Sequence, residues 1–280
     1  MIRVAAIDLG TNATRLLVAD VDGESVHEVL RRTRITKLGE GVDARRRLLP
    51  LPIARVRNVL AEFRREAAEL GAERTLAVAT SAVRDAENGE AFLGEVEWSY
   101  GFATRLLSGD EEAAMTLRGV GPLEAGTLVV DVGGGSTELI TTDFRTSLDV
   151  GSVRLTERFG DDREAAGAFV RSLLPPLRAE RALGVDGTTA ELAALGATAL
   201  PEMREALRWL DASTDEERRS RLLEPDRSEV LGAGVVVLLA VLPHVGLDRI
   251  EPSDRDLLNG AALAAAVLPE PPERGVHVCC

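Results

Sequence analysis

The pattern of hydrophobic positions at the start of the chain predicts three strands followed by a helix. A short apolar run at 5–10 ends in Asp and Gly, which is typical of a buried strand that enters a turn. Two more strands are expected at 15–21 and 25–32, joined by a hairpin turn. Residues 52–70 repeat their apolar positions with helical spacing, and Gly71 supplies the end of this helix.

Strands and helices continue to alternate as far as about residue 120. A buried strand is expected at 75–79 and a helix from 85 to about 97. After a strand near 103–107, the segment that begins at Ser108 has a helix-capping serine and an acidic first turn. We expect Glu111 to serve this helix start, because a carboxylate there complements the helix dipole. The alternation predicts an α/β fold.

The opening pattern returns 123 residues later. Residues 129–140 align without a gap on residues 6–17, and Asp, Gly and Thr recur at matching positions. These pairs are Asp8 and Asp131, Gly10 and Gly133, and Thr14 and Thr137. We interpret this as a duplicated strand–loop–strand unit. The sequence therefore predicts two domains, 1–122 and 123–280, each with a mixed sheet flanked by helices.

The second half is predicted to be mainly helical beyond its opening strands. Candidate helices cover 152–159, 163–182, 188–196, 201–220, 227–242 and 254–267. One short strand at 183–185 precedes a third glycine-containing segment at 186–189. The proline-rich segment 269–280 is expected to be a flexible tail.

Composition indicates a soluble cytoplasmic protein. The chain is 45% hydrophobic and 28% charged, and no apolar run reaches the roughly 18 residues that a membrane helix needs. The first residues enter a strand pattern directly, so we expect no signal peptide. The only cysteines, Cys279 and Cys280, provide no disulfide framework, which favours a reducing compartment.

The net charge of −13 is unevenly distributed. Residues 1–60 hold eleven Lys or Arg against seven Asp or Glu, whereas the remainder is strongly acidic. We expect a locally positive cleft that attracts an anion, on an acidic protein that is not a general nucleic-acid binder. The three histidines lack metal-ligand spacing, and the few aromatic residues offer no stacking platform for single strands.

The repeated Asp–Gly loops are suited to phosphate. Glycines let backbone N–H groups approach an anion closely, and an aspartate at the strand end can hold Mg²⁺ beside it. Two such loops would face each other across a cleft, and the third, before a helix, would add an anion site. The expected substrate contacts in these loops are Gly10, Thr11, Asn12, Gly133, Gly134, Gly135, Ser136, Gly187 and Thr188.

These motifs resemble those of the exopolyphosphatase/guanosine pentaphosphate phosphohydrolase (Ppx/GppA) family, within the actin-like superfamily. The matching segments, in the family's order, are 8–12, 80–88, 108–113, 131–138, 151–157 and 187–189. The resemblance implies two actin-like (ribonuclease H-like) domains with the active site in the cleft between them. It also implies a homodimer and a divalent cation, Mg²⁺ or Mn²⁺.

The resemblance implies roles for several charged residues. Glu112 matches the position of the base that activates water, and Arg84 matches a phosphate-contacting arginine. Asp131 and Glu138 match metal-associated carboxylates that also serve catalysis, with Asp8 as the weaker analogue in the first loop. These roles agree with the needs of phosphoanhydride hydrolysis, which are charge neutralisation and a positioned water.

The repeat adds a role for Arg15. Arg15 is the repeat partner of Glu138, so this position has diverged in charge between the halves. One loop would thereby gain a basic contact to phosphate, and the other a carboxylate for metal or water.

Lys37 is the only lysine in the sequence. Arg45, Arg46 and Arg47 form either a solvated loop or an extension of the surface that binds a long polyanion.

The leading interpretation is an exopolyphosphatase that releases orthophosphate from the end of inorganic polyphosphate. A second interpretation is the same chemistry on guanosine pentaphosphate, which presents a similar terminal phosphoanhydride. A third is a kinase of the same superfamily, and a fourth is a non-catalytic regulator that binds polyphosphate or nucleotide. Retention of Glu112, Asp131 and Glu138 argues against the regulator.

Overall fold

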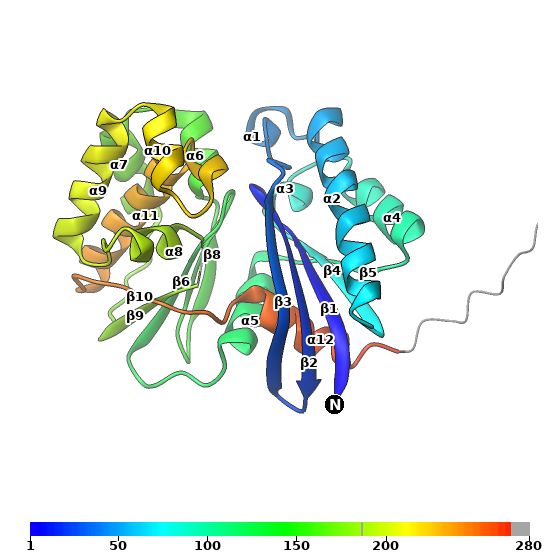
Figure 1. The fold of residues 1–280 in the computed structure, drawn as a ribbon. Helices are drawn as coiled ribbons and strands as arrows, with labels where there is room; N and C mark the ends of the chain where they lie inside the picture. Colours follow the sequence, from blue (N-terminus) through cyan, green and yellow to red (C-terminus); the bar gives the residue numbers. More distant parts are fainter. Residues whose placement is uncertain (186, 270–280) are drawn as a thin grey trace, which may run out of the picture.

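Two five-stranded mixed sheets form the framework of the protein, one in each lobe (Figure 1). The computed structural model describes residues 1–185 and 187–269. The first sheet contains β1 (Ile2–Leu9), β2 (Ala13–Asp22), β3 (Ser25–Ile35), β4 (Arg74–Ala79) and β5 (Ala103–Leu106) in the order β3-β2-β1-β4-β5. The second contains β6 (Thr127–Val132), β7 (Thr137–Ile140), β8 (Arg145–Leu148), β9 (Arg181–Gly184) and β10 (Glu251–Pro252) in the order β10-β9-β6-β7-β8.

The two sheets have the same topology. In the first, β1 pairs with β2 antiparallel and with β4 parallel. In the second, β6 pairs in the same way with β7 and β9. The predicted duplication is confirmed, because the strands correspond one to one in the two sheets.

The helices surround both sheets. In the first half they are α1 (Val42–Arg45), α2 (Pro50–Glu69), α3 (Ser81–Arg84), α4 (Gly89–Tyr100) and α5 (Gly109–Val120). In the second half they are α6 (Ser152–Phe159), α7 (Arg163–Leu173), α8 (Gly187–Ala194), α9 (Leu200–Ala212), α10 (Asp215–Arg221), a 3-10 turn (Pro225–Arg227), α11 (Leu231–Val245) and α12 (Leu257–Ala266). In the part of the chain that the structure describes, no helix combines the length and the apolar character needed to cross a membrane.

Several predicted boundaries were wrong. The helix expected at 163–182 ends at Leu173, because two prolines follow at 175 and 176 and a proline restricts the residue before it. The helix expected at 201–220 is interrupted at Ser213, where Thr214 caps a new helix and forms a capping box with Glu217. The strands β8 and β10 were missed, because β8 (RTSL) is mostly polar with no buried residue and β10 has only two residues.

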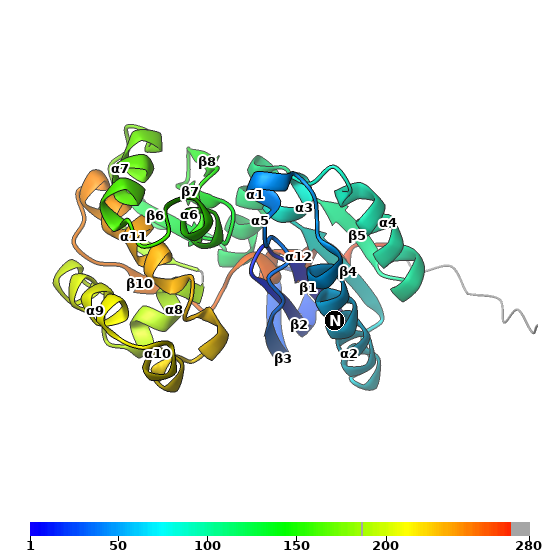
Figure 2. The ribbon, with the colours of Figure 1, turned by 90° about the horizontal axis from the view of Figure 1, so that it is seen from above.

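Helices cover both faces of the first sheet because its central strand is buried on both sides. Ala5 and Ile7 of β1 pack with α2 and α4, whereas Val4 and Ala6 point to the opposite face and pack with α12. Figure 2 shows α2 and α4 on the outer side of this lobe and α12 toward the centre of the molecule.

Helix α5 is shared by the two lobes. Met115 packs with the core of the first sheet, whereas Ala113 and Leu117 pack with Val129 and Ile140 of the second. Helix α5 follows β5, and its counterpart α12 follows β10 and packs on the first sheet. Each half therefore ends in a helix that contacts the sheet of the other half, so the cores of the two halves are joined. The division between 122 and 123 stays a prediction.

Glycines allow α5 and α12 to lie in close contact. A Cβ built on Gly260 would lie 2.0 Å from the carbonyl oxygen of Met115, and one built on Gly119 would lie 2.0 Å from that of Asp256. Side chains at these positions would force the helices apart. This contact holds the base of the two lobes together and positions the helix that carries Glu112.

Candidate active site

The first and second glycine loops meet between the lobes. A Cβ built on Gly134 would lie 2.8 Å from Thr11 Cβ, and one built on Gly135 would lie 2.3 Å from Ser81 Oγ. The small cavity at this contact, which Thr11, Ser81 and Gly135 help to line, has a volume of about 10 Å³. A space of this size holds at most about one water molecule. The two loops are therefore closed on each other in this arrangement.

The repeated aspartates lie opposite the residues that diverged between the halves. Asp8 pairs in register with Arg15, and Asp131 pairs in register with Glu138. Arg15 forms an ion pair of 2.8 Å with Asp8, and a second one of the same length with Asp256, the residue before α12. At this position the first lobe therefore has an aspartate paired with an arginine, Asp8 and Arg15. The second lobe has two carboxylates, Asp131 and Glu138.

Helix α5 presents Glu112 to this region through a well-formed N-terminus. Ser108 accepts a hydrogen bond from the backbone of Glu111, and the Glu111 carboxylate accepts one from the backbone of Ser108. The expected role of Glu111 at the helix start is thus confirmed. Glu112, the next residue, is only 7% exposed and accepts a hydrogen bond of 3.1 Å from Arg84. Arg84 is fixed in turn by the carbonyl oxygen of Leu107, at 2.8 Å.

Burial changes the acidity of both glutamates. Burial raises the pKa of Glu112 to about 7, although the charge and the hydrogen bond of Arg84 act in the opposite direction. Glu138 is fully buried, and burial, followed by the charges of Glu112 and Asp131, raises its pKa well above the usual value. Because Glu112 comes from the first half and Glu138 from the second, the two lobes contribute to one carboxylate cluster.

Glu138 accepts a hydrogen bond from a serine hydroxyl on the neighbouring strand. Ser147 of β8 lies opposite Glu138 in register and donates a hydrogen bond of 2.6 Å to Oε1. Within the described residues, Oε2 of Glu138 and Oδ1 of Asp8 are buried without a hydrogen-bond partner. Buried oxygen atoms of this kind are suited to a ligand that brings positive charge or a proton.

The three carboxylates expected at the metal do not form a ready three-ligand site. Across residues 1–185 and 187–269, no three His, Cys, Asp or Glu side chains are placed so that they could hold a metal ion together. For Asp8 the reason is visible, because Oδ2 is occupied by Arg15. The oxygen donors are present, but they do not surround one point.

Two larger cavities lie between the lobes, and neither has the excess of positive charge expected from residues 1–60. The larger, about 480 Å³, is lined by Arg15, Arg31 and Arg227 together with five Asp or Glu side chains. The smaller, about 320 Å³, contains Lys37 and Arg55, paired with Glu229 and Glu40. The expectation of a positive cleft was wrong, because carboxylates, most of them from beyond residue 60, line the same cavities as these basic residues.

The third glycine loop contributes only part of what was predicted. Gly187 lines the larger cavity with Arg15, but Thr188 is buried against Gly234 of α11, where a Cβ would lie 2.5 Å from Thr188 Oγ1. Asp186 lies outside the described residues, as do Cys279, Cys280 and most of the predicted tail. The run from Arg45 to Arg47 is exposed at the end of α1.

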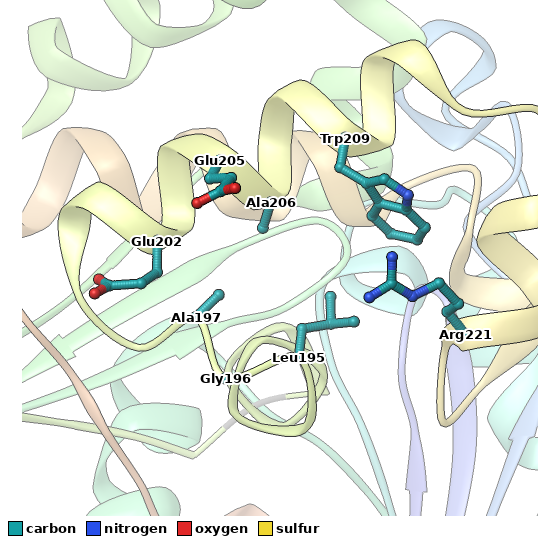
Figure 3. A pocket seen from close by; sticks show the side chains of 8 residues that line it. All are labelled: Leu195, Gly196, Ala197, Glu202, Glu205, Ala206, Trp209 and Arg221. Atoms are coloured by element: carbon teal, nitrogen blue, oxygen red, sulfur yellow. The ribbon is translucent and has the colours of Figure 1, made fainter.

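A further cavity of about 360 Å³ lies in the second lobe (Figure 3). Its lining comes from the segment 195–221, and Arg221 lies over the ring of Trp209 at 4.7 Å. The cavity shares no lining residue with the cavities between the lobes.

Three residues of the site were missed by the sequence-based prediction. Ser147 and Asp256 lie in segments without a recognised motif. Arg154 lies in the family-like segment 151–157, whose motif indicates no role for it, and the structure places it at the contact of the two glycine loops. The only available signal was the presence of Arg154 in that motif.

Comparison with known proteins places these features in one family. A model of the Ppx/GppA phosphatase family matches residues 17–174. Exopolyphosphatase 2 of Mycobacterium tuberculosis is 36% identical, over 94% of this chain and 98% of its own. Guanosine-5'-triphosphate,3'-diphosphate pyrophosphatase of Vibrio vulnificus is 30% identical, over 92% of this chain and 58% of its own.

A solved structure agrees with this assignment. The crystal structure of an exopolyphosphatase-like protein superposes with a TM-score of 0.85 and 31% identity, covering 94% of this chain and 97% of that protein. The expected architecture of two mixed sheets flanked by helices is confirmed. The chain belongs to the Ppx/GppA phosphatase family of hydrolases and has its two-domain actin-like fold.

Proposed function

We propose that this protein is an exopolyphosphatase, which hydrolyses the terminal phosphoanhydride of inorganic polyphosphate and releases orthophosphate. The observation that carries the proposal is the buried pair Glu112 and Glu138 beside two facing glycine loops. The name of the Mycobacterium tuberculosis relative, which is similar along nearly the whole chain, supports the same reaction.

In the proposed reaction, the oxygen of a water molecule attacks the terminal phosphorus while the bond to the bridging oxygen breaks. The shortened chain leaves with the bridging oxygen, and Glu112 accepts the proton of the attacking water. A pKa of about 7 allows Glu112 to be deprotonated at neutral pH and still to take up a proton. Arg84 orients the Glu112 carboxylate, and backbone N–H groups of 10–12 and 133–136 would bind phosphate oxygens.

A divalent cation, Mg²⁺ or Mn²⁺, fits the donor chemistry of the site. Asp131, Glu138 and the unpaired oxygen of Asp8 would supply the hard oxygen ligands that such cations prefer. Mg²⁺ commonly keeps several waters and uses only one or two carboxylates with substrate phosphates, so a complete protein cage is not required. When bound, the cation would neutralise charge on the terminal phosphates, which the acidic lining of the cavities does not.

A second candidate is removal of the terminal phosphate of guanosine pentaphosphate. The similarity to the Vibrio vulnificus relative and the cavity of about 480 Å³ beside Arg15 favour it, since that space is much larger than a single phosphate.

The cytoplasmic location, the homodimer, and the absence of nucleic-acid and membrane partners remain predictions.

The test is a substrate panel with the purified protein. Polyphosphates of several lengths, guanosine pentaphosphate and ATP are incubated with and without Mg²⁺, and orthophosphate is measured for the wild type and for Glu112→Gln. We expect release from polyphosphate that needs the cation and is lost in the variant. Preference for guanosine pentaphosphate would favour the second candidate. Binding without hydrolysis would favour a regulator, and transfer from ATP to another acceptor would favour a kinase.

A further inference from the structure

Arg154 is a buried cation at the contact of the two glycine loops. It lies in the first turn of α6 and is only 8% exposed. Its Nε donates a hydrogen bond of 2.8 Å to the carbonyl oxygen of Gly135, in the second glycine loop. Its remaining nitrogens reach across to the first lobe, where they bind Asp43, Asp85 (2.5 Å) and the hydroxyl of Ser81 (3.3 Å).

The bonds of Arg154 divide into two groups. The bond to Gly135 joins residues of the same lobe, and backbone bonds from 152–154 to Gly133 and Gly134 also tie the start of α6 to this loop. The bonds to Asp43 and Asp85 cross between the lobes. If the lobes separate, Arg154 therefore stays with the second glycine loop and loses its two carboxylates.

Separation is required before phosphate can enter between the loops. The loops touch each other, and the cavity at their contact has a volume of only about 10 Å³. A phosphate group that enters there would meet the guanidinium of Arg154 at the place that the two carboxylates now occupy. Arg binds phosphate oxygens with the same fork of N–H donors that it uses for carboxylates.

We propose that Arg154 is a phosphate-binding residue of the second glycine loop, and that Asp43 and Asp85 cover it when the lobes are closed. The inference rests on the proposed function for the identity of the ligand, a chain of phosphates. Asp43 and Asp85 occupy the place of substrate oxygens, so substrate must displace them. They lower the apparent affinity, because only the separated form can bind.

The ion pairs of Arg154 with Asp43 and Asp85 form a bridge between the lobes, and variants at both of its ends test the inference. Binding of inorganic tripolyphosphate with Mg²⁺ is measured by calorimetry in a Glu112→Gln background, where turnover is prevented. Asp43→Asn and Asp85→Asn are expected to tighten binding severalfold, because they uncover Arg154. Arg154→Gln is expected to weaken binding by about tenfold or more, because it removes a charge-assisted contact to phosphate. A bridge that serves structure alone would shift all three variants in the same direction, and that result would overturn the inference.

Controls separate a binding role from a folding defect. Arg163→Gln removes an arginine whose ion pair with Asp211 stays within the second lobe, and it should leave tripolyphosphate affinity unchanged. Arg154→Lys keeps a charge without the fork and should bind between the wild type and Arg154→Gln. Thermal unfolding identifies any variant that fails to fold. If the wild type does not hydrolyse polyphosphate but the opposed shifts in binding appear, the proposed function fails and the phosphate site stands.

Discussion

Arg84 and Glu112 form an ion pair of 3.1 Å that joins the residue expected to contact phosphate to the residue expected to activate water. Arg84 follows the first-lobe strand β4, whereas Glu112 lies on α5 between the two sheets. The ion pair places the expected phosphate contact beside the expected base, and the charge and hydrogen bond of Arg84 lower the pKa of Glu112.

Glu112→Gln should abolish most of the turnover. The amide keeps the size of the side chain and can accept the hydrogen bond from Arg84, but it cannot take a proton from water. Loss of a general base commonly lowers kcat by about 10²–10⁴-fold, so we expect a loss in this range with little change in Tm. Glu111→Gln is the matched control, because Glu111 serves the capping box, and it should lower Tm while kcat stays near that of the wild type. Equal effects on kcat would contradict the assignment.

The pH dependence of kcat should report the acidity of Glu112. Only the deprotonated carboxylate acts as a base, so activity is expected to fall as the pH drops below about 7. Arg84 holds the pKa of Glu112 below the value that burial alone would give. Arg84→Met should therefore move the acidic limb of the kcat profile to higher pH, as measured by orthophosphate release at saturating substrate. An unchanged or lower limb would show that another group titrates.

Glu138 should make the protein less stable as the pH rises. Burial raises the folded-state pKa of Glu138 above the 4.5 of a free side chain, so its contribution to stability is complete below about 4.5 and is lost as the pH passes its folded pKa. Glu138→Gln removes this loss because the amide does not ionise. We therefore expect the difference in Tm, variant minus wild type, to be larger at pH 8 than at pH 5. Both measurements are made in the absence of divalent cations. Glu202→Gln, on the exposed face of α9, is the control and should show the same Tm difference at both values.

The fold was predictable where local chemistry repeats. The strand, Asp and glycine turn at Asp8 recur at Asp131 with a constant offset, and that offset identified the duplicated sheets. The exchange of α5 and α12 between the lobes was not predictable, because apolar spacing shows that a helix is buried without showing which sheet it contacts. Short edge strands such as β10, with two residues, give no periodic signal.

The candidate site was predictable in its residue types and not in its pairings. Motifs marked Glu112, Arg84 and the glycine loops. Arg15 pairs with Asp8 on the neighbouring strand, but its second partner, Asp256, is 241 positions away, and no local pattern connects them. The same holds for Arg154 and Asp85, which come from two separate motifs. Charge counts along the chain could not predict the acidic lining of the cavities, since that lining is assembled from distant segments.

The contact of α5 with α12 should be sensitive to a single methyl group. A Cβ on Gly260 would lie 2.0 Å from the backbone oxygen of Met115, so Gly260→Ala must displace one helix. Overpacking of this kind costs about 1–3 kcal/mol, or roughly 3–10 °C in Tm. Because α5 carries Glu112, kcat should fall as well. Gly94→Ala, in α4, meets nothing within 4 Å and should instead raise Tm slightly, since alanine favours a helix by about 0.5–1 kcal/mol. Thermal unfolding and orthophosphate release measure both effects, and shifts of Tm in the same direction would contradict the close packing of α5 and α12.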